Sequence, residues 1–83
     1  MQVLYFAWVR EAVGTAAEEV SPPTEVGSVA ELIDWLAGRS ERHADAFRER
    51  ARLRAAVDQA FVPLSAPIRG AKEIAIFPPV TGG

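Results

Sequence analysis

The sequence contains no cysteine and only one histidine, His43. Without cysteine the chain can form neither disulfides nor a dithiol redox pair, and one histidine supplies too few soft ligands for a structural zinc site. We therefore expect no metal site. His43 stands among charged residues in the most polar segment of the chain, which favours an exposed side chain over a catalytic base held by an orienting carboxylate.

Long apolar runs and an excess of positive charge are also missing. The longest apolar run, residues 3–9, is far shorter than the ~18 residues needed to span a bilayer. The first positive side chain, Arg10, follows this run, whereas a secretory signal places such a charge before it. Because the formal net charge is −2, no overall positive field attracts nucleic acid. The sequence predicts a cytoplasmic protein without a membrane or nucleic-acid partner.

What is present describes one small globular domain. The 83 residues are 49% apolar and 24% charged, and a chain of this length has room for a single core. Ser28 and Glu31 form a capping box, in which the Ser28 hydroxyl bonds the Glu31 amide and Glu31 reaches back to Ser28. Apolar residues follow at helical spacing, so we expect the main helix to begin here and to end near Gly38.

Strand patterns lie on both sides of this helix. Alternating or continuous apolar residues predict five strands, at residues 3–8, 16–21, 53–57, 60–64 and 73–77. The third and fourth are joined by a turn at Asp58 and Gln59. A helical turn closed by Gly14 and a second, polar helix over residues 41–52 complete the order. The expected fold class is α+β, with a mixed sheet of about five strands and one main helix across one face.

Alternation along the first and last strands separates the two faces of the expected sheet. If Tyr5 and Ile76 face the main helix, Phe6 and Phe77 emerge together on the other face. A run of arginines precedes the third strand and is interrupted by glutamates: Arg39, Arg42, Arg48, Arg50, Arg52 and Arg54. We interpret this run as a solvated face, and docking on an acidic protein surface is the alternative.

The last six residues differ from an ordinary frayed end, which is usually polar, because they carry no charged side chain. Pro78-Pro79 blocks continuation of the sheet and favours a stiff, extended segment that projects from the domain. Gly82-Gly83 has no Cβ atoms, so this part of the chain can thread a narrow channel and present a terminal carboxylate there. We therefore divide the chain into a domain, residues 1–77, and an extended tail, residues 78–83.

The chain resembles a known protein family. Phe77 to Gly83 reads FPPVTGG, which is similar to the terminal signature of the small subunit of molybdopterin synthase, the MoaD-like proteins. Residues 3–14, 55–59 and 73–76 resemble the first strand and turn, the central hairpin and the last strand of that family. The likeness covers nearly the whole chain, and the tail is its specific part.

The resemblance implies a β-grasp, ubiquitin-like fold and a sulfur-carrier role. An E1-like enzyme that uses ATP is expected to adenylate Gly83, and a sulfur donor system then converts it to a thiocarboxylate. The sulfur is delivered to a cyclic pyranopterin in a large catalytic subunit, and two deliveries make the dithiolene of molybdopterin. The family usually forms a heterotetramer of two small and two large subunits. This chain would then be a non-catalytic, sulfur-donating subunit that binds no cofactor itself.

By position, the resemblance assigns two groups of residues. Gly83 is the sulfur-bearing residue, and the tail inserted in the partner comprises Phe77, Pro78, Pro79, Val80, Thr81 and Gly82. We expect the apolar patch that docks on the large subunit to contain Phe6, Phe61 and Phe77. Packing of these phenylalanines in the core or at a sheet edge is the alternative.

Two positions depart from the family pattern, and two other functions remain as alternatives. Asp58 stands where the family often has Asn, and Lys72 replaces a common acidic residue, so either could alter partner contacts. The first other function is a related carrier for thiazole or tRNA sulfur transfer, or an isopeptide-forming modifier. The Pro-Pro-Val-Thr before Gly-Gly weighs against it. The second is a plain protein-interaction domain with a passive tail.

Overall fold

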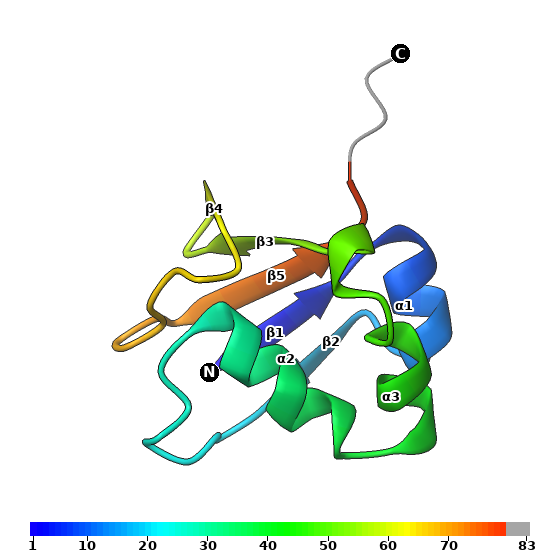
Figure 1. Ribbon diagram of the computed structural model, residues 1–83, viewed down its shortest axis with the longest axis horizontal. Helices are drawn as coiled ribbons and strands as arrows, with labels where there is room; N and C mark the ends of the chain where they lie inside the picture. Colours follow the sequence, from blue (N-terminus) through cyan, green and yellow to red (C-terminus); the bar gives the residue numbers. More distant parts are fainter. Residues whose placement is uncertain (80–83) are drawn as a thin grey trace.

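The structure, a computed structural model, describes residues 1–79 (Figure 1). Its elements in chain order are β1 (Gln2–Tyr5), α1 (Ala7–Val13), β2 (Ala17–Glu19), α2 (Val29–Ala37), α3 (Glu41–Ala46), the 3₁₀ helix η1 (Arg50–Arg52), β3 (Arg54–Val57), β4 (Ala60–Val62) and β5 (Glu73–Phe77). The strands form one sheet in the order β2-β1-β5-β3-β4. Of these pairings, only β1 with β5 is parallel. The α+β class and the mixed five-stranded sheet are confirmed.

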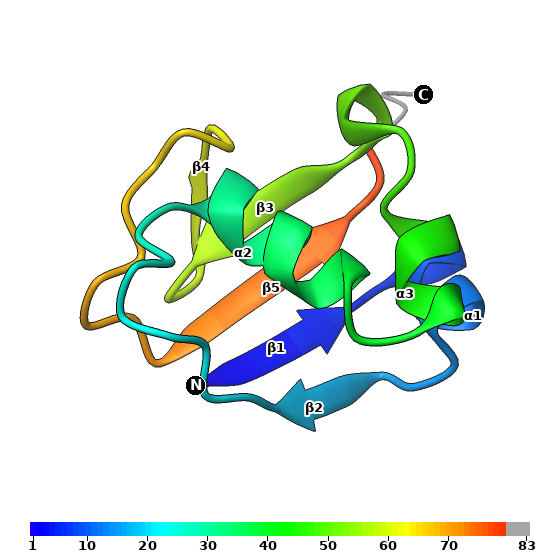
Figure 2. The same cartoon turned by 60° about the horizontal axis from the view of Figure 1, so that its bottom comes forward.

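The core lies between the sheet and α2, which crosses one face of the sheet (Figure 2). Tyr5 pairs with Ile76 in the parallel ladder, and Ile76 pairs with Ala55 on β3, so these three side chains point to the same face. All three are at most 1% exposed. They meet the apolar stripe of α2, whose buried members are Val29, Leu32, Ile33 and Leu36. The expected main helix and its buried face are therefore confirmed.

The capping box at the start of α2 forms as expected. The Ser28 hydroxyl oxygen accepts a hydrogen bond from the Glu31 amide at 3.1 Å, and the Ser28 hydroxyl donates to Glu31 Oε1 at 3.3 Å. The backbone N–H of Gly27 also donates to Glu31 Oε1, at 2.9 Å. These bonds supply partners to backbone groups that the first turn of a helix leaves unpaired.

The first strand is shorter than predicted and the first helix is longer. β1 ends at Tyr5 because the chain turns sharply at Ala7, whose φ of 54° is left-handed and unusual for a residue with a Cβ. The expected strand over residues 3–8 is therefore wrong at its end. Gly14 closes α1 as expected, with a φ of 97° and its N–H donating to Arg10 O at 2.8 Å.

The expected helix over residues 41–52 is wrong, because two short elements replace it. α3 ends at Ala46, where the buried ring of Phe47 enters the core, and the chain resumes helical turns only in η1. Nε of Arg50 donates to Phe47 O at 2.7 Å, which satisfies a carbonyl at this break. The β3–β4 hairpin is confirmed, with Asp58 and Gln59 both at positive φ as a two-residue turn requires.

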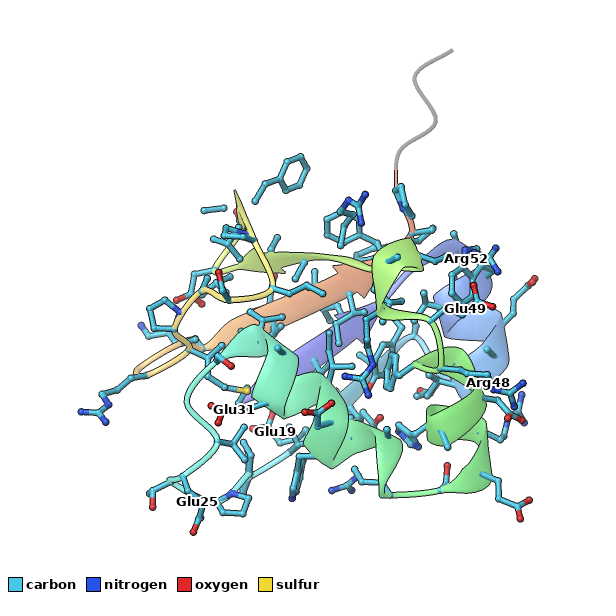
Figure 3. The ribbon with its side chains drawn as sticks, viewed as in Figure 1. Glu19, Glu25, Glu31, Arg48, Glu49 and Arg52 are labelled. Carbon is cyan, nitrogen blue, oxygen red and sulfur yellow. The ribbon has the colours of Figure 1, made fainter. Side chains whose placement is uncertain are left out.

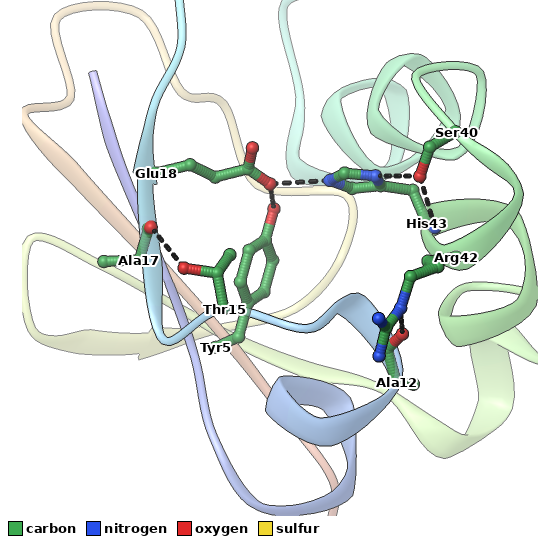
Figure 4. A network of polar contacts seen from close by, with 8 residues as sticks. All are labelled: Tyr5, Ala12, Thr15, Ala17, Glu18, Ser40, Arg42 and His43. Atoms are coloured by element: carbon green, nitrogen blue, oxygen red, sulfur yellow. Dashed lines mark hydrogen bonds and ion pairs between the residues drawn. The ribbon is translucent and has the colours of Figure 1, made fainter.

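His43 is buried, so the expectation of an exposed surface histidine is wrong. Its residue is only 9% exposed, and its ring lies between α3 and β2 in a network of polar contacts (Figure 4). Nε2 of His43 lies 2.6 Å from Oε2 of Glu18, and the Tyr5 hydroxyl donates to the same oxygen at 2.6 Å. Nδ1 of His43 is hydrogen-bonded to Ser40 Oγ at 2.7 Å. Ser40 also caps α3, and this cap turns His43 toward the sheet.

The network shifts the pKa values of two of its members in opposite directions. Burial, with the hydrogen bond to Glu18 and the charge of that residue, raises the pKa of the Tyr5 hydroxyl. Burial alone would also raise the pKa of the Glu18 carboxyl. Hydrogen bonds from Tyr5 and His43 outweigh it, together with the charges of His43 and Arg39, and hold this pKa below its ordinary value of 4.5. Glu18 is thus bound most strongly as a carboxylate.

The lowered pKa of Glu18 predicts acid-sensitive stability. Its contribution to the free energy of unfolding is complete above the unfolded pKa and is lost as the pH falls through the lower folded pKa. We expect Glu18→Gln to cost about 1–3 kcal/mol at neutral pH, because it removes charge-assisted hydrogen bonds. The penalty should shrink as the pH falls from the ordinary glutamate range through the lower folded pKa, as measured by urea denaturation. Glu25→Gln, at an exposed loop position, is the control, and a pH-independent penalty for Glu18→Gln would contradict the prediction.

Candidate functional site

The three phenylalanines expected to form an apolar patch lie on the face of the sheet opposite α2. Phe6 at the end of β1 is 48% exposed, and Phe61 on β4 is 81% exposed. The rings of Phe61 and Phe77 lie 5.5 Å apart between centroids, in a tilted arrangement. Phe6 lines the same shallow hollow as the other two rings. The structure therefore places all three residues together, and their role in docking stays a prediction.

The strand register explains why these side chains share a face. Leu4 pairs with Ala75, Ala75 with Ala56, and Ala56 with Phe61, so one row of side chains crosses four strands. The two alanines are short and leave a hollow of about 580 Å³ between the larger side chains. We call this surface the aromatic face: Leu4, Phe6, Ala56, Phe61, Ala75 and Phe77. Alternation along the chain places Leu4 with Phe6 and Ala75 with Phe77, and the strand register then brings Ala56 and Phe61 to the same face.

The tail leaves the domain at the edge of the aromatic face. Phe77 is the last residue of β5, and Pro78 and Pro79 follow it along the rim of the same hollow. The remaining tail residues, Val80 to Gly83, lie outside the described residues. The sequence-based assignments of Val80, Thr81, Gly82 and Gly83 are therefore still predictions, as is the division of the chain at residue 77.

The departures at Asp58 and Lys72 meet in one structural contact. Oδ1 of Asp58 accepts hydrogen bonds from the backbone N–H groups of Lys72 and Glu73, each at 2.9 Å. An asparagine at position 58 could offer the same carbonyl-type acceptor. The departure at Asp58 thus preserves the contact that joins the hairpin turn to the start of β5.

Within residues 1–79, the structure contains no group of three or more metal-ligating side chains. The same part of the chain holds no helix with the length and apolar character needed to cross a membrane. The polar cluster of Tyr5, Glu18 and His43 is partly buried between α3 and the sheet, and on the aromatic face the hollow is lined mostly by apolar atoms. The described residues at the root of the tail thus border an exposed apolar surface.

Comparison with known proteins identifies the family. Residues 3–83 match the ThiS family over nearly the whole chain.

The chain belongs to the ThiS family.

Curated relatives in this family match from end to end. A protein from Escherichia coli named molybdopterin synthase sulfur carrier subunit is 45% identical over 83 residues, covering 100% of this chain and 99% of the relative. A Haemophilus influenzae protein of the same name is 34% identical over 83 residues, with the same coverage. A third, from Mycosarcoma maydis, is 35% identical over 88 residues and covers 100% of this chain and 92% of its own. The resemblance drawn from the FPPVTGG tail is confirmed.

Solved structures share the fold of this ThiS-family chain. SAMP1 from Haloferax volcanii superposes with a TM-score of 0.73 at 24% identity, covering 100% of this chain and 98% of that one. A Pyrococcus furiosus chain, named for subunit 1 of a molybdopterin converting factor, gives a TM-score of 0.73 at 28% identity, with 95% of each chain covered. The expected ubiquitin-like β-grasp fold is confirmed.

The exposure of Phe61 predicts that this ring contributes little to folding. We expect Phe61→Ala to lower the free energy of unfolding by at most about 1 kcal/mol, the value of its pairing with Phe77. Ile76→Ala, on β5 of the same sheet but fully buried, should cost about 2–5 kcal/mol. Urea denaturation of both variants measures the difference, and equal penalties would show that Phe61 belongs to the core.

Proposed function

We propose that this chain is the sulfur-carrier subunit of a molybdopterin synthase. The observation that carries the proposal is the end-to-end match to relatives named molybdopterin synthase sulfur carrier subunit, up to 45% identical. The position of the tail supports it, because Pro78 and Pro79 follow β5 directly at the rim of an exposed apolar surface. A carrier of this kind acts in the cytoplasm, where its partners supply the chemistry.

The reacting group in this proposal is the carboxylate of Gly83, taken as the C-terminal residue. An E1-like enzyme joins this carboxylate to AMP from ATP and releases pyrophosphate. Sulfur from a donor system then displaces AMP and leaves a thiocarboxylate. The thiocarboxylate sulfur attacks a carbon of a cyclic pyranopterin that bears oxygen, so that the C–S bond forms as the C–O bond breaks and the oxygen leaves. Water then cleaves the resulting thioester, which leaves sulfur on the pterin as a thiolate and restores the carboxylate. The chain has no cysteine whose thiolate could intercept the activated carbonyl.

The aromatic face is the proposed contact with the large catalytic subunit. Exposed aromatic side chains are enriched at protein interfaces, and a few of them usually carry most of the binding energy. Phe6 and Phe61 are the exposed large apolar side chains of the described domain. A partner that covers this face also meets the root of the tail at Phe77 and Pro78. Docking and insertion of the tail are therefore parts of one interface, in an expected assembly of two small and two large subunits.

The tail chemistry is tested by mass spectrometry of the protein produced with its own sulfur-transfer enzymes. Replacement of one carboxylate oxygen by sulfur should add about 16 Da at Gly83. One extra residue after Gly83 should abolish this gain and the formation of molybdopterin, with an unchanged unfolding transition. Sulfuration of the pterin by the extended protein would contradict the proposal. An amide bond between Gly83 and another protein would favour a modifier, and full activity after deletion of Gly83 would favour a passive interaction domain.

The docking surface is tested by placing a charge on it. We expect Phe61→Asp to weaken binding to the large subunit about 100-fold or more, since a central aromatic contact is lost and a carboxylate is desolvated. Thr24→Asp introduces the same charge at an exposed loop position and should bind as the wild type does. Isothermal titration calorimetry measures both affinities. Equal affinities for the two variants would remove the aromatic face from the interface.

A further inference from the structure

The aromatic face ends at a positively charged edge where the tail leaves the domain. Arg54 pairs directly with Phe77 across β3 and β5, so its side chain starts from the same face of the sheet as that ring. In Figures 1 and 2 the turn of η1 lies beside the end of β5, and Figure 3 shows Arg52 at this end of the molecule. We call Arg52 and Arg54 the arginine edge.

Other arginines of the same run are occupied by contacts within the domain. Arg48 pairs with Asp45 at 2.6 Å, and Arg50 forms an ion pair with Asp34. Arg42 donates hydrogen bonds to Ala12 O at 3.0 Å and to a second carbonyl of the same helix end. Arg42 and Arg50 join different helices, so the expectation of a merely solvated face does not describe these two, whereas the exposed Arg48 contacts only its own helix end.

Neither member of the arginine edge forms an ion pair among residues 1–79. The guanidinium of Arg52 stacks over the ring of Trp8, 4.9 Å from its centroid. Nη1 of Arg54 donates to Ala51 O at 3.1 Å and to Leu53 O at 2.8 Å. Both side chains are thus held in place by contacts that leave their charge uncompensated.

The bonds of Arg54 also leave a specific binding edge. They use Nη1 alone, and among residues 1–79 the side chain has no hydrogen bond from Nε or Nη2. This edge of a guanidinium matches the two oxygens of a carboxylate. A carboxylate on a partner could bind there without breaking the contacts that fix Arg54.

The opposite end of the aromatic face has the opposite charge. Glu73 lies at the start of β5, two and four residues from Ala75 and Phe77, so alternation places its side chain on the same face. It lines the same hollow. The face is therefore apolar in the middle, with a carboxylate at one end and guanidinium groups at the end where the tail leaves.

We propose that the arginine edge binds carboxylates of the large subunit that border its tail-receiving pocket. A partner can cover an apolar face in two opposite orientations, and charges arranged in this way favour one of them. Only the orientation with partner carboxylates at Arg52 and Arg54 brings the pocket to the root of the tail. The edge thereby directs docking, while the aromatic face provides most of the binding energy. This inference rests on the proposed function.

The test measures binding of the full chain to its large subunit by calorimetry as a function of salt. For the wild type, affinity should fall as sodium chloride rises from about 0.05 to 0.4 M. At the low end, Arg54→Gln should weaken binding about two- to fivefold and Arg54→Glu about tenfold, and both losses should shrink at the high end. Arg54→Lys should retain the salt dependence but lose part of the affinity, because a lysine cannot bind a carboxylate with two fixed donors.

Arg69→Glu is the matched control. Arg69 is an exposed loop residue that lines a separate hollow with Met1 and Pro22, and its substitution makes the same change in net charge. It should bind within about twofold of the wild type. Thermal unfolding of each variant shows whether it is folded. Acidic-to-lysine substitutions in the large subunit should include one that restores binding of Arg54→Glu, an effect that a purely structural role of Arg54 cannot produce.

The outcomes separate the inference from the proposed function. If Arg54→Glu binds like the wild type with the same salt dependence, the arginine edge plays no part in docking and the inference is wrong. It is also wrong if Arg69→Glu weakens binding as much as Arg54→Glu, because net charge alone then explains the effect. If the wild-type chain does not bind the large subunit at all, the proposed function itself fails.

Discussion

The parallel pairing of β1 with β5 is the contact on which the rest of this small domain depends. It joins the two ends of the chain at the centre of the sheet, with Tyr5 opposite Ile76. Because both residues face α2, the residues that follow them, Phe6 after β1 and Phe77 in β5, fall to the other face or its edge. One pairing thus closes the core, builds the aromatic face and sets the place where the tail leaves.

A polar network supports this arrangement from the side of the core. Tyr5, Glu18 and His43 would be costly to bury singly, yet within residues 1–79 no buried side-chain nitrogen or oxygen lacks a partner. The network ties α3 to β1 and β2, and Arg42 on α3 ties that helix to the end of α1. Since α1 follows Phe6 directly, contacts far from the tail help to hold the aromatic face in position.

The aromatic face and its charged ends offer a partner two kinds of interaction. Aromatic rings and short alanines offer an apolar surface with a shallow hollow, which gains affinity through burial. Charged groups at its ends add direction, because Coulomb forces act over a longer range and have a sign. In the proposed function the reacting group lies at the end of the tail, and both kinds of interaction are needed because a partner bound in the reverse orientation leaves that group outside the pocket.

The sequence by itself determined the class of the fold, the main helix and the family. Local signals, such as the capping box at Ser28 and the FPPVTGG tail, suffice for these features because they arise from residues that are neighbours in the chain. Tertiary structure decided the burial of His43, which needs Glu18 and Tyr5 from distant strands, and the break after Ala46, where Phe47 enters the core. It also separated paired from unpaired arginines. Such contacts join residues far apart in the chain, so no local pattern reports them.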